Sequence, residues 1–248
     1  MPVLDPAGSP ILEPVTAPKG PSVFEDFIDI YYAPRQVFAR RRQGEFFAAL
    51  VAVTLLIVVL SVAFYSLLET GYDRMADQAI AQARKNPGFN DAAASAIRSF
   101  TAFSVKYGAI LFIPLFAFIG GLITWLVGRF FDAKLTYGQS MTVTTYSIFP
   151  LILGSIVMAI MSFIVSPDSV VGIQSYMLSP ARFFDPNTTN AGLVALLMRI
   201  DPFAIWSAFI TGVGISELGR ISLGKGLGAA FVIWLIGTLL QAGPAALR

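Results

Sequence analysis

Five long apolar stretches constrain the fold of this chain more than any other feature of its sequence. They cover residues 46–68, 107–128, 139–165, 203–218 and 227–243. A helix needs roughly 20 apolar residues to cross a hydrocarbon core about 30 Å thick. The first three stretches reach that length, and the last two lie near its lower limit. The pattern predicts an all-α, polytopic integral membrane protein with five transmembrane helices.

The composition agrees with this class and argues against several others. Charged residues make up 13% of the chain, about half the roughly 25% of a soluble domain. The formal net charge of +2 is too small to favour a nucleic-acid-binding protein. The chain contains neither cysteine nor histidine, which removes thiolate metal sites and the commonest general base. We therefore expect no metal, no cofactor and no enzymatic activity.

Two segments precede the first apolar stretch. Residues 1–23 carry proline at positions 2, 6, 10, 14, 18 and 21, so we expect a disordered tail there. Residues 24–45 are expected to form interfacial helices, because apolar side chains recur at i, i+3, i+4 and i+7 from Phe24 and Pro34 can open a second helix. An amphipathic helix of this kind lies at the membrane–water interface, with its rings at headgroup depth.

The basic end of this interfacial segment has two interpretations. The triplet Arg40, Arg41 and Arg42 meets the first apolar stretch almost directly. It is either an orientation signal and anchor for anionic lipid headgroups, where each cation contributes on the order of 1 kcal/mol, or a site for an acidic partner. The first interpretation is favoured. The candidate lipid or partner interface comprises Phe24, Phe27, Ile28, Tyr31, Tyr32, Pro34, Arg35, Phe38, Arg40, Arg41 and Arg42.

The connections between the apolar stretches differ in length. Residues 69–106 are predicted to form a long extracytoplasmic loop of two helical pieces, with the second capped by Asn90 or Asp91. Residues 166–202 are predicted to form a second such loop with one short interfacial or re-entrant helix, since its apolar run of about ten residues is too short to cross. Asp201 is expected to cap the fourth span.

The other two linkers are short, so they join helical hairpins. Basic residues beside the span ends and in these linkers predict a cytoplasmic amino terminus. Five spans then place the carboxyl terminus outside the cytoplasm.

Glu217 is the ionisable side chain within the apolar stretches that is a candidate functional residue. Arg220 follows it at i+3, so a helix-end ion pair is predicted, and this is favoured over a proton or cation site. Arg129 and Asp132 repeat the same spacing after the second stretch and are interpreted in the same way.

Small residues recur at every fourth position in the last two stretches. They are Ala208, Gly212 and Ser216 in the fourth stretch, and Gly224 and Gly228 at the start of the fifth. Such spacing allows helix backbones to approach closely. It predicts packing within a compact bundle, with dimerisation through the fourth span as the alternative.

Three regions resemble the Yip domain family of Ypt/Rab-interacting proteins and its prokaryotic relatives. The segment from Asp201 to Ile236 is similar to the family's closing segment, and the positions that match are Asp201, Phe203, Trp206, Gly214, Ser222 and Lys225. "LTYGQSMTVTTYSIFPLIL" resembles the third-span region, and "IDIYYAPRQVFARRR" resembles the interfacial lead-in, with Pro34 and Phe38 at matching places. The resemblance implies five spans and a cytoplasmic amino terminus. The acidic and Tyr-Gly-containing motifs of the Rab-associated members are not clearly present in this sequence, so the resemblance does not imply Rab binding.

Two functions from different classes follow from these patterns. The first is a non-enzymatic membrane scaffold or adaptor, whose partners are anionic lipid headgroups and other membrane proteins or a second copy of itself. The second is a small transporter or channel, or a subunit of one. Polar side chains that meet at mid-depth would favour the second, and Thr142, Thr144, Thr145 and Tyr146 are the candidates. The location expected for a prokaryotic-type member is the bacterial cytoplasmic membrane.

Overall fold

The computed structural model describes residues 22–246, and this part of the chain is helical with no β-strand. Its α-helices are α1 Val23–Asp29, α2 Pro34–Arg40, α3 Phe47–Ala83, α4 Asp91–Tyr107, α5 Ala109–Phe130, α6 Tyr137–Tyr146, α7 Phe149–Met161, α8 Ala191–Met198, α9 Pro202–Gly219 and α10 Leu223–Ala246. Three short 3₁₀ helices, Pro167–Ser169, Ile173–Tyr176 and Pro180–Phe183, lie between α7 and α8. Residues 1–21 of the predicted proline-rich tail lie outside the described residues.

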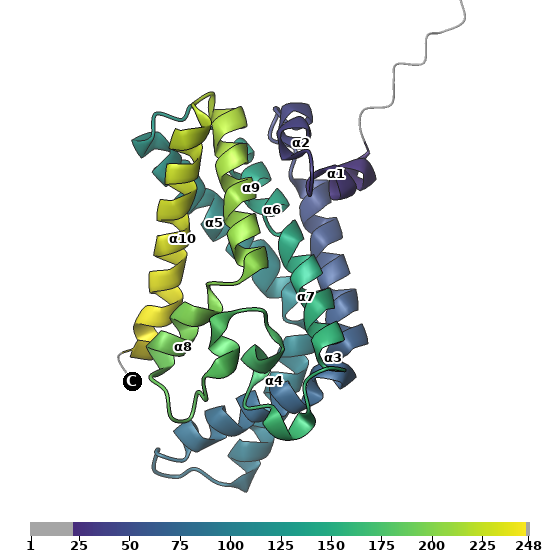
Figure 1. The fold of residues 1–248 in the computed structure, drawn as a ribbon, viewed down its shortest axis with the longest axis vertical. Helices are drawn as coiled ribbons and strands as arrows, with labels where there is room; N and C mark the ends of the chain where they lie inside the picture. The colour runs from purple at the N-terminus through teal and green to yellow at the C-terminus, as the bar shows by residue number, and fades with distance from the viewer. Residues whose placement is uncertain (1–21, 247–248) are drawn as a thin grey trace, which may run out of the picture.

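The helices form an elongated bundle, with the short helices α1 and α2 packed across one end (Figure 1). Four helical segments are long and apolar enough to cross a membrane, namely Phe47–Ala83, Ala109–Phe130, Tyr137–Met161 and Leu223–Ala242. A fifth candidate is the pair α8–α9, which passes the same test only as a unit bent by 61°. The chain is therefore an all-helical membrane protein with four or five spanning segments.

Helix α9 packs at the centre of the bundle and is not by itself long and apolar enough to cross a membrane. Half of its residues are buried, and α2, α6, α7 and α10 all pack against it. The buried residues lie between Ile210 and Gly219, where other helices surround α9, so threonine, serine and glycine are tolerated there. The Asp201 carboxylate caps its first turn by accepting from the backbone N–H groups of Phe203 and Ala204.

Helix α3 continues well beyond the predicted first span. Its 37 residues extend for about 55 Å at 1.5 Å per residue, so the helix outruns a hydrocarbon core of roughly 30 Å. The sequence predicts that this span ends at Leu68, because charged residues begin there, but no helix breaker follows. Gly71 does not interrupt the helix and instead packs against Tyr176. The first helical piece of the predicted loop is thus the distal part of α3.

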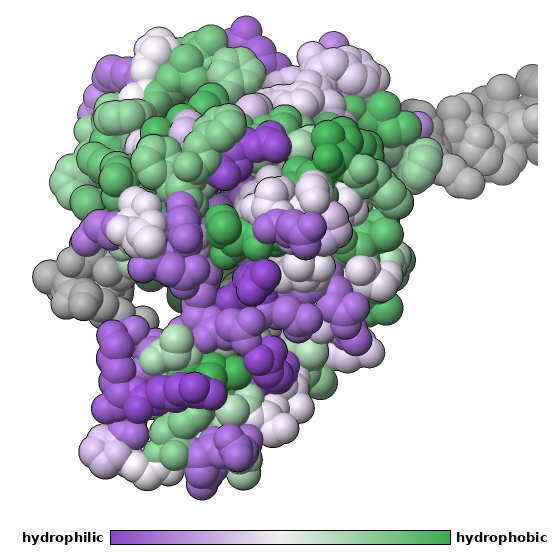
Figure 2. Space-filling view, turned by 60° about the horizontal axis from the view of Figure 1, so that its bottom comes forward, coloured by the Kyte–Doolittle hydropathy of each residue, from purple (hydrophilic) through white to green (hydrophobic). Residues whose placement is uncertain are grey.

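The distal part of α3 and helix α4 form an antiparallel hairpin at the end of the bundle opposite α1 and α2 (Figure 1). Asn90 caps α4 through its side chain. Arg98 pairs with Asp77 across the hairpin, and the Lys106 ammonium lies 3.9 Å from the centre of the Tyr65 ring. Figure 2 shows that hydrophilic side chains gather over this end, while hydrophobic ones cover the flank above it.

The closest helix crossing joins α9 to α10 through small residues. An added Cβ at Gly226 would lie 2.3 Å from the carbonyl oxygen of Gly212 and 2.9 Å from the Cβ of Ser216. At Gly224 an added Cβ would meet nothing within 4 Å. The contact residue of α10 is therefore Gly226, where the sequence spacing had indicated Gly224. Because α10 of the same chain already covers Gly212 and Ser216, this face is not available for the alternative dimer.

Candidate functional site

The arginine triplet differs from its prediction, because two of its three side chains fold inward onto Asp26. The Asp26 side chain is fully buried. Arg40 donates to its Oδ1 from Nε at 3.1 Å and from Nη2 at 2.8 Å, and Arg41 donates from Nε to Oδ2 at 2.6 Å. The Tyr146 hydroxyl donates to the same Oδ2 at 2.9 Å. Arg40 and Arg41 therefore fasten α1 and α2 to the bundle, and lipid phosphate is not their main partner.

Asp29 extends this network towards solvent. It accepts from the Tyr32 hydroxyl at 2.5 Å and from Arg40 Nη2 at 2.6 Å. The bond from Tyr32 and the bond from Arg40 hold the pKa of the Asp29 carboxyl below its usual range. The carboxylate stabilises the fold where it is ionised, and this contribution is lost as the pH falls through its lowered pKa.

The third arginine of the triplet belongs to a separate, exposed cluster. Arg42 Nη2 lies 2.9 Å from Glu217, and Arg35 Nε lies 3.8 Å from the same carboxylate. The predicted partner, Arg220, makes no ion pair with Glu217 in the described residues. Arg220 is instead the C-cap of α9, with φ of 54° in the left-handed region.

The second predicted i, i+3 pair is also replaced by longer-range contacts. Asp132 pairs with Lys225 at 2.5 Å, which links the α5–α6 connection to the start of α10. The hydrogen bond from Lys225 lowers the pKa of the Asp132 carboxyl. The Arg129 guanidinium lies 3.9 Å from the centre of the Trp125 ring. Both carboxylates therefore find partners that are distant in sequence.

The apolar residues predicted for one helical face, Phe24, Phe27, Ile28 and Tyr31, divide between two faces of the structure. Phe27 packs edge-on against Phe149 with ring centroids 4.5 Å apart, and the Tyr31 ring lies 5.6 Å from that of Trp206. Phe24 and Ile28 are 72% and 51% exposed. The sequence had placed all four on one lipid-facing surface. Only the outer pair remains available to lipid, because the inner pair holds the helix to the bundle.

Phe38 was also placed at the lipid interface by the sequence, and the structure buries it. Its ring has no exposed surface and lies edge-on to Tyr146, with centroids 6.2 Å apart. An added Cβ at Gly214 would lie 2.7 Å from Cζ of this ring. Gly214 therefore provides the space that lets α2 dock on α9. Residues 22–40 form a cap, here called the α1–α2 cap, fixed on one end of the bundle.

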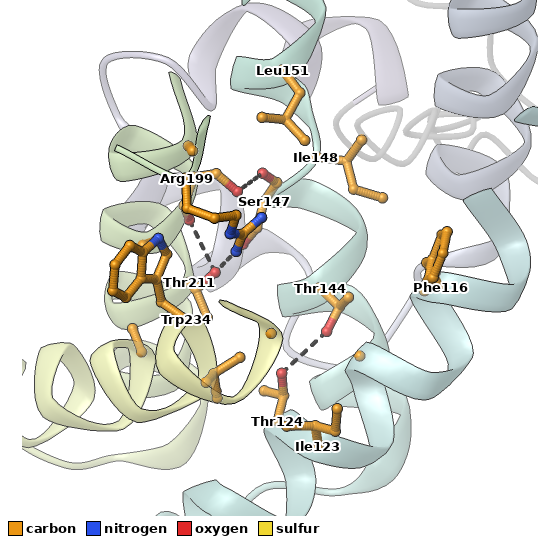
Figure 3. A pocket seen from close by; sticks show the side chains of 18 residues that line it. Phe116, Ile123, Thr124, Thr144, Ser147, Ile148, Leu151, Arg199, Thr211 and Trp234 are labelled. Carbon is orange, nitrogen blue, oxygen red and sulfur yellow. Dashed lines mark hydrogen bonds between the residues drawn. The ribbon is translucent and has the colours of Figure 1, made fainter. Parts of the chain in front are cut away.

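A second site is a hollow of about 330 Å³ inside the bundle. The sequence alone does not predict it. Helices α5, α9 and α10 contribute most of its wall. Figure 3 shows its most informative side chains, which are Phe116, Ile123, Thr124, Thr144, Ser147, Ile148, Leu151, Arg199, Thr211 and Trp234. Phe116 and Leu151 are 62% and 44% exposed, so the hollow reaches the lipid-facing surface.

Polar side chains gather in this hollow where the third spanning segment breaks. The break at Ser147 and Ile148 has a simple cause, since Pro150 cannot donate the helix hydrogen bond expected four residues back. At the break the Leu151 N–H donates to the Ile148 carbonyl, so the Ser147 carbonyl is free to accept from the Ser207 hydroxyl. Thr211 donates to the Ser147 hydroxyl at 2.9 Å (Figure 3). The hydroxyls of Thr124 and Thr144 lie 3.3 Å apart.

The four mid-depth candidates from the sequence have different places. Thr144 lines the hollow. Thr142 donates to the carbonyl of Gly138 in its own helix, and the Thr145 hydroxyl is buried without a protein partner. Tyr146 belongs to the Asp26 network of the cap.

Arg199 supplies the charge in the hollow. It follows α8 directly, at the bend before α9, and its Nε donates to Thr238 of α10 at 3.4 Å. Among residues 22–246 no carboxylate lies within ion-pair distance of it. The sequence signal was an arginine at the end of the apolar run "AGLVALLM", next to a helix break. This signal is weak, because an apolar run too short to cross a membrane is predicted to belong to a loop.

Comparison with known proteins identifies the family. A family model described as the Yip1 domain matches residues 28–243, which is most of the chain. The chain belongs to the Yip1 domain family. No curated protein and no solved structure matches it. The Yip1 domain match covers both the α1–α2 cap from Ile28 onward and every helix that lines the Arg199 hollow.

Proposed function

We propose that this protein is a non-enzymatic scaffold of the bacterial cytoplasmic membrane, which engages lipid headgroups and neighbouring membrane proteins through its α1–α2 cap. One observation carries this proposal. Phe24, Ile28 and Tyr32 recur every fourth position and are 72%, 51% and 70% exposed, while the opposite face of the cap is fixed by the Asp26 network. Exposed rings on a rigid amphipathic element favour a position in the headgroup region.

The charges around the cap support the same orientation. Arg42, Glu217 and Arg220 line an open hollow of about 530 Å³, and Arg35 lies beside Glu217. Three cations around one carboxylate leave this end positively charged, as expected for the cytoplasmic side and for contact with anionic lipid. Five spans with a cytoplasmic amino terminus are part of the proposal.

The position of the cap is tested with single cysteines, since the native chain has none. Ile28→Cys would carry a fluorescent probe in vesicles that contain lipids with a spin-label quencher near the headgroup. We expect strong quenching by these lipids and little by aqueous iodide. Gln36→Cys, an exposed position on α2 of the same cap, is the matched control and should show the reverse. Quenching of the Ile28 probe by iodide alone would contradict the proposal.

Transport is the second candidate function, because polar side chains do meet inside the bundle around Ser147. It predicts a water-filled path to Thr144, whereas a scaffold predicts a dry hollow.

One labelling experiment separates the two functions and maps the topology. Single cysteines at Asn86, Lys134, Asn187, Ser222 and Thr144 would be exposed to a membrane-impermeant thiol reagent, first in intact cells and then in opened vesicles. We expect the two asparagine positions to react in intact cells, and Lys134 and Ser222 only after opening. Thr144 should stay unreactive in both. Reaction at Thr144 would favour transport. The orientation would be overturned if Lys134 and Ser222 reacted in intact cells, or if the two asparagine positions reacted only after opening.

A further inference from the structure

Within residues 22–246 no carboxylate lies within ion-pair distance of Arg199, although this side chain lies in an apolar part of the molecule. Its Nε donates to Thr238 at 3.4 Å. The carboxylate nearest in sequence, Asp201, is occupied as the N-cap of α9. An ionised side chain within a membrane domain is costly and normally lies against an opposite charge. The charge balance of this hollow is therefore completed by an anion.

The hydrogen-bonding groups of the hollow point to the same conclusion. A guanidinium has five N–H donors, and in the described part of the chain Arg199 donates from Nε alone. Among the same residues the buried Trp234 Nε1–H group has no acceptor, and this ring lies on the same wall as Arg199 (Figure 3). One hydroxyl of the pair Thr124 and Thr144 also keeps a proton to donate. These N–H and O–H groups are donors that phosphate oxygens can accept from.

An apolar groove continues from the hollow along the outer surface of α9 and α10. It has a volume of about 360 Å³, and its walls are Ile200, Ile205, Ala208, Phe209, Leu227, Ala230, Phe231 and Trp234. Ala208, Ala230 and Trp234 line the hollow as well. On α10 the groove extends from Leu227 to Trp234, about 10 Å at the helical rise. This length accommodates part of one acyl chain.

We propose that the Arg199 hollow and this groove together bind one anionic phospholipid. The phosphate lies against Arg199 and Trp234 at the α8–α9 bend, and an acyl chain lies between α9 and α10. Charge selects the headgroup and the apolar groove selects a lipid over a free anion. The site lies at the opposite end of α9 from the α1–α2 cap, so it is independent of the proposed scaffold function.

Trp234 provides a direct readout of the lipid. The double variant Trp125→Phe, Trp206→Phe leaves it as the single tryptophan. This protein would be placed in phosphatidylcholine vesicles and titrated with either phosphatidylglycerol or phosphatidylcholine carrying brominated chains, which quench tryptophan on contact. We expect the relative association constant to favour phosphatidylglycerol by roughly five- to tenfold.

Variants and a competing anion make the result decisive. Arg199→Gln should abolish the preference, whereas Arg182→Gln should retain it, because Arg182 lies outside the hollow against the Phe183 ring. If Arg199→Gln fails to fold, the relative association constant of the two lipids in the parent protein still tests the proposal. Equal constants for the two lipids, or an unchanged preference in Arg199→Gln, would overturn the proposal. Loss of the preference when inorganic phosphate replaces chloride at equal ionic strength would mean that the site takes a free anion, which also overturns it.

Discussion

Asp26→Asn should lower the free energy of unfolding by roughly 3 kcal/mol, the lower end of the range for breaking a buried ion pair. The substitution keeps the size of the side chain, so it creates no cavity. The loss of stability therefore comes from the removed charge and its hydrogen bonds. Arg40 and Arg41 would both lose a fully buried carboxylate, and the Tyr146 hydroxyl would lose its ionised acceptor. The loss lies at the lower end because Arg40 retains Asp29.

The measurement is equilibrium unfolding by SDS in mixed micelles, followed by tryptophan fluorescence. Glu45→Gln is the control, since Glu45 is 55% exposed and 3.9 Å from Arg41. It should change the free energy by less than about 0.5 kcal/mol, as is typical of surface ion pairs. Equal effects for Asp26→Asn and Glu45→Gln would show that the cap is not held by the buried carboxylate. The cap must be fixed in this way for the outer face of α1 to be presented at a constant depth.

The sequence predicts the four segments that are long and apolar enough to span, because their signal is local. An apolar run of sufficient length has few alternatives to a membrane helix, and breaks at Pro34 and Pro150 follow from the missing N–H. Caps such as Asn90 and Asp201 are equally local, because a side-chain oxygen reaches an N–H group two or three residues ahead. These features required no knowledge of the tertiary arrangement.

The sites were harder to predict because their partners are distant in the chain. Asp26 meets Arg40 and Arg41 only because the turn after α1 brings α2 back towards it, and spacing in the sequence does not predict this contact. Glu217 had a convenient neighbour at i+3, yet the structure pairs it with Arg42, 175 residues away. Local spacing shows which pairs are possible, whereas the docking of the cap on α9 decides which pairs form.

Arg199 illustrates a different limit. The short apolar helix before it is too brief to span alone, and the sequence gives no sign that it combines with α9 as one bent segment. Once the two are joined, the arginine lies within the membrane domain, and the lack of a carboxylate partner among residues 22–246 becomes informative. Burial, more than residue type, makes this position a candidate binding site.

Gly226→Ala should destabilise the protein by about 1–3 kcal/mol, the usual cost of an extra methyl in a packed interior. The new Cβ would lie 2.3 Å from the Gly212 carbonyl oxygen, and backbone of a central helix cannot move aside as a flexible side chain can. The α9–α10 crossing must then widen. Because Ala208 and Ala230 lie in this interface and line both the hollow and the groove, the preference for anionic lipid should weaken as well.

Gly224→Ala is the matched control for this crossing. It lies two residues away in the same helix, and its added Cβ meets nothing within 4 Å. Alanine is favoured over glycine in a helix by up to about 1 kcal/mol, so this variant should unfold at the same or a higher SDS fraction than the parent. A helix-packing role for Gly224, as its four-residue spacing to Gly228 indicated, requires the opposite result. The pair therefore tests whether close backbone approach at Gly226, and not glycine content at the start of α10, sets the geometry of the lipid groove.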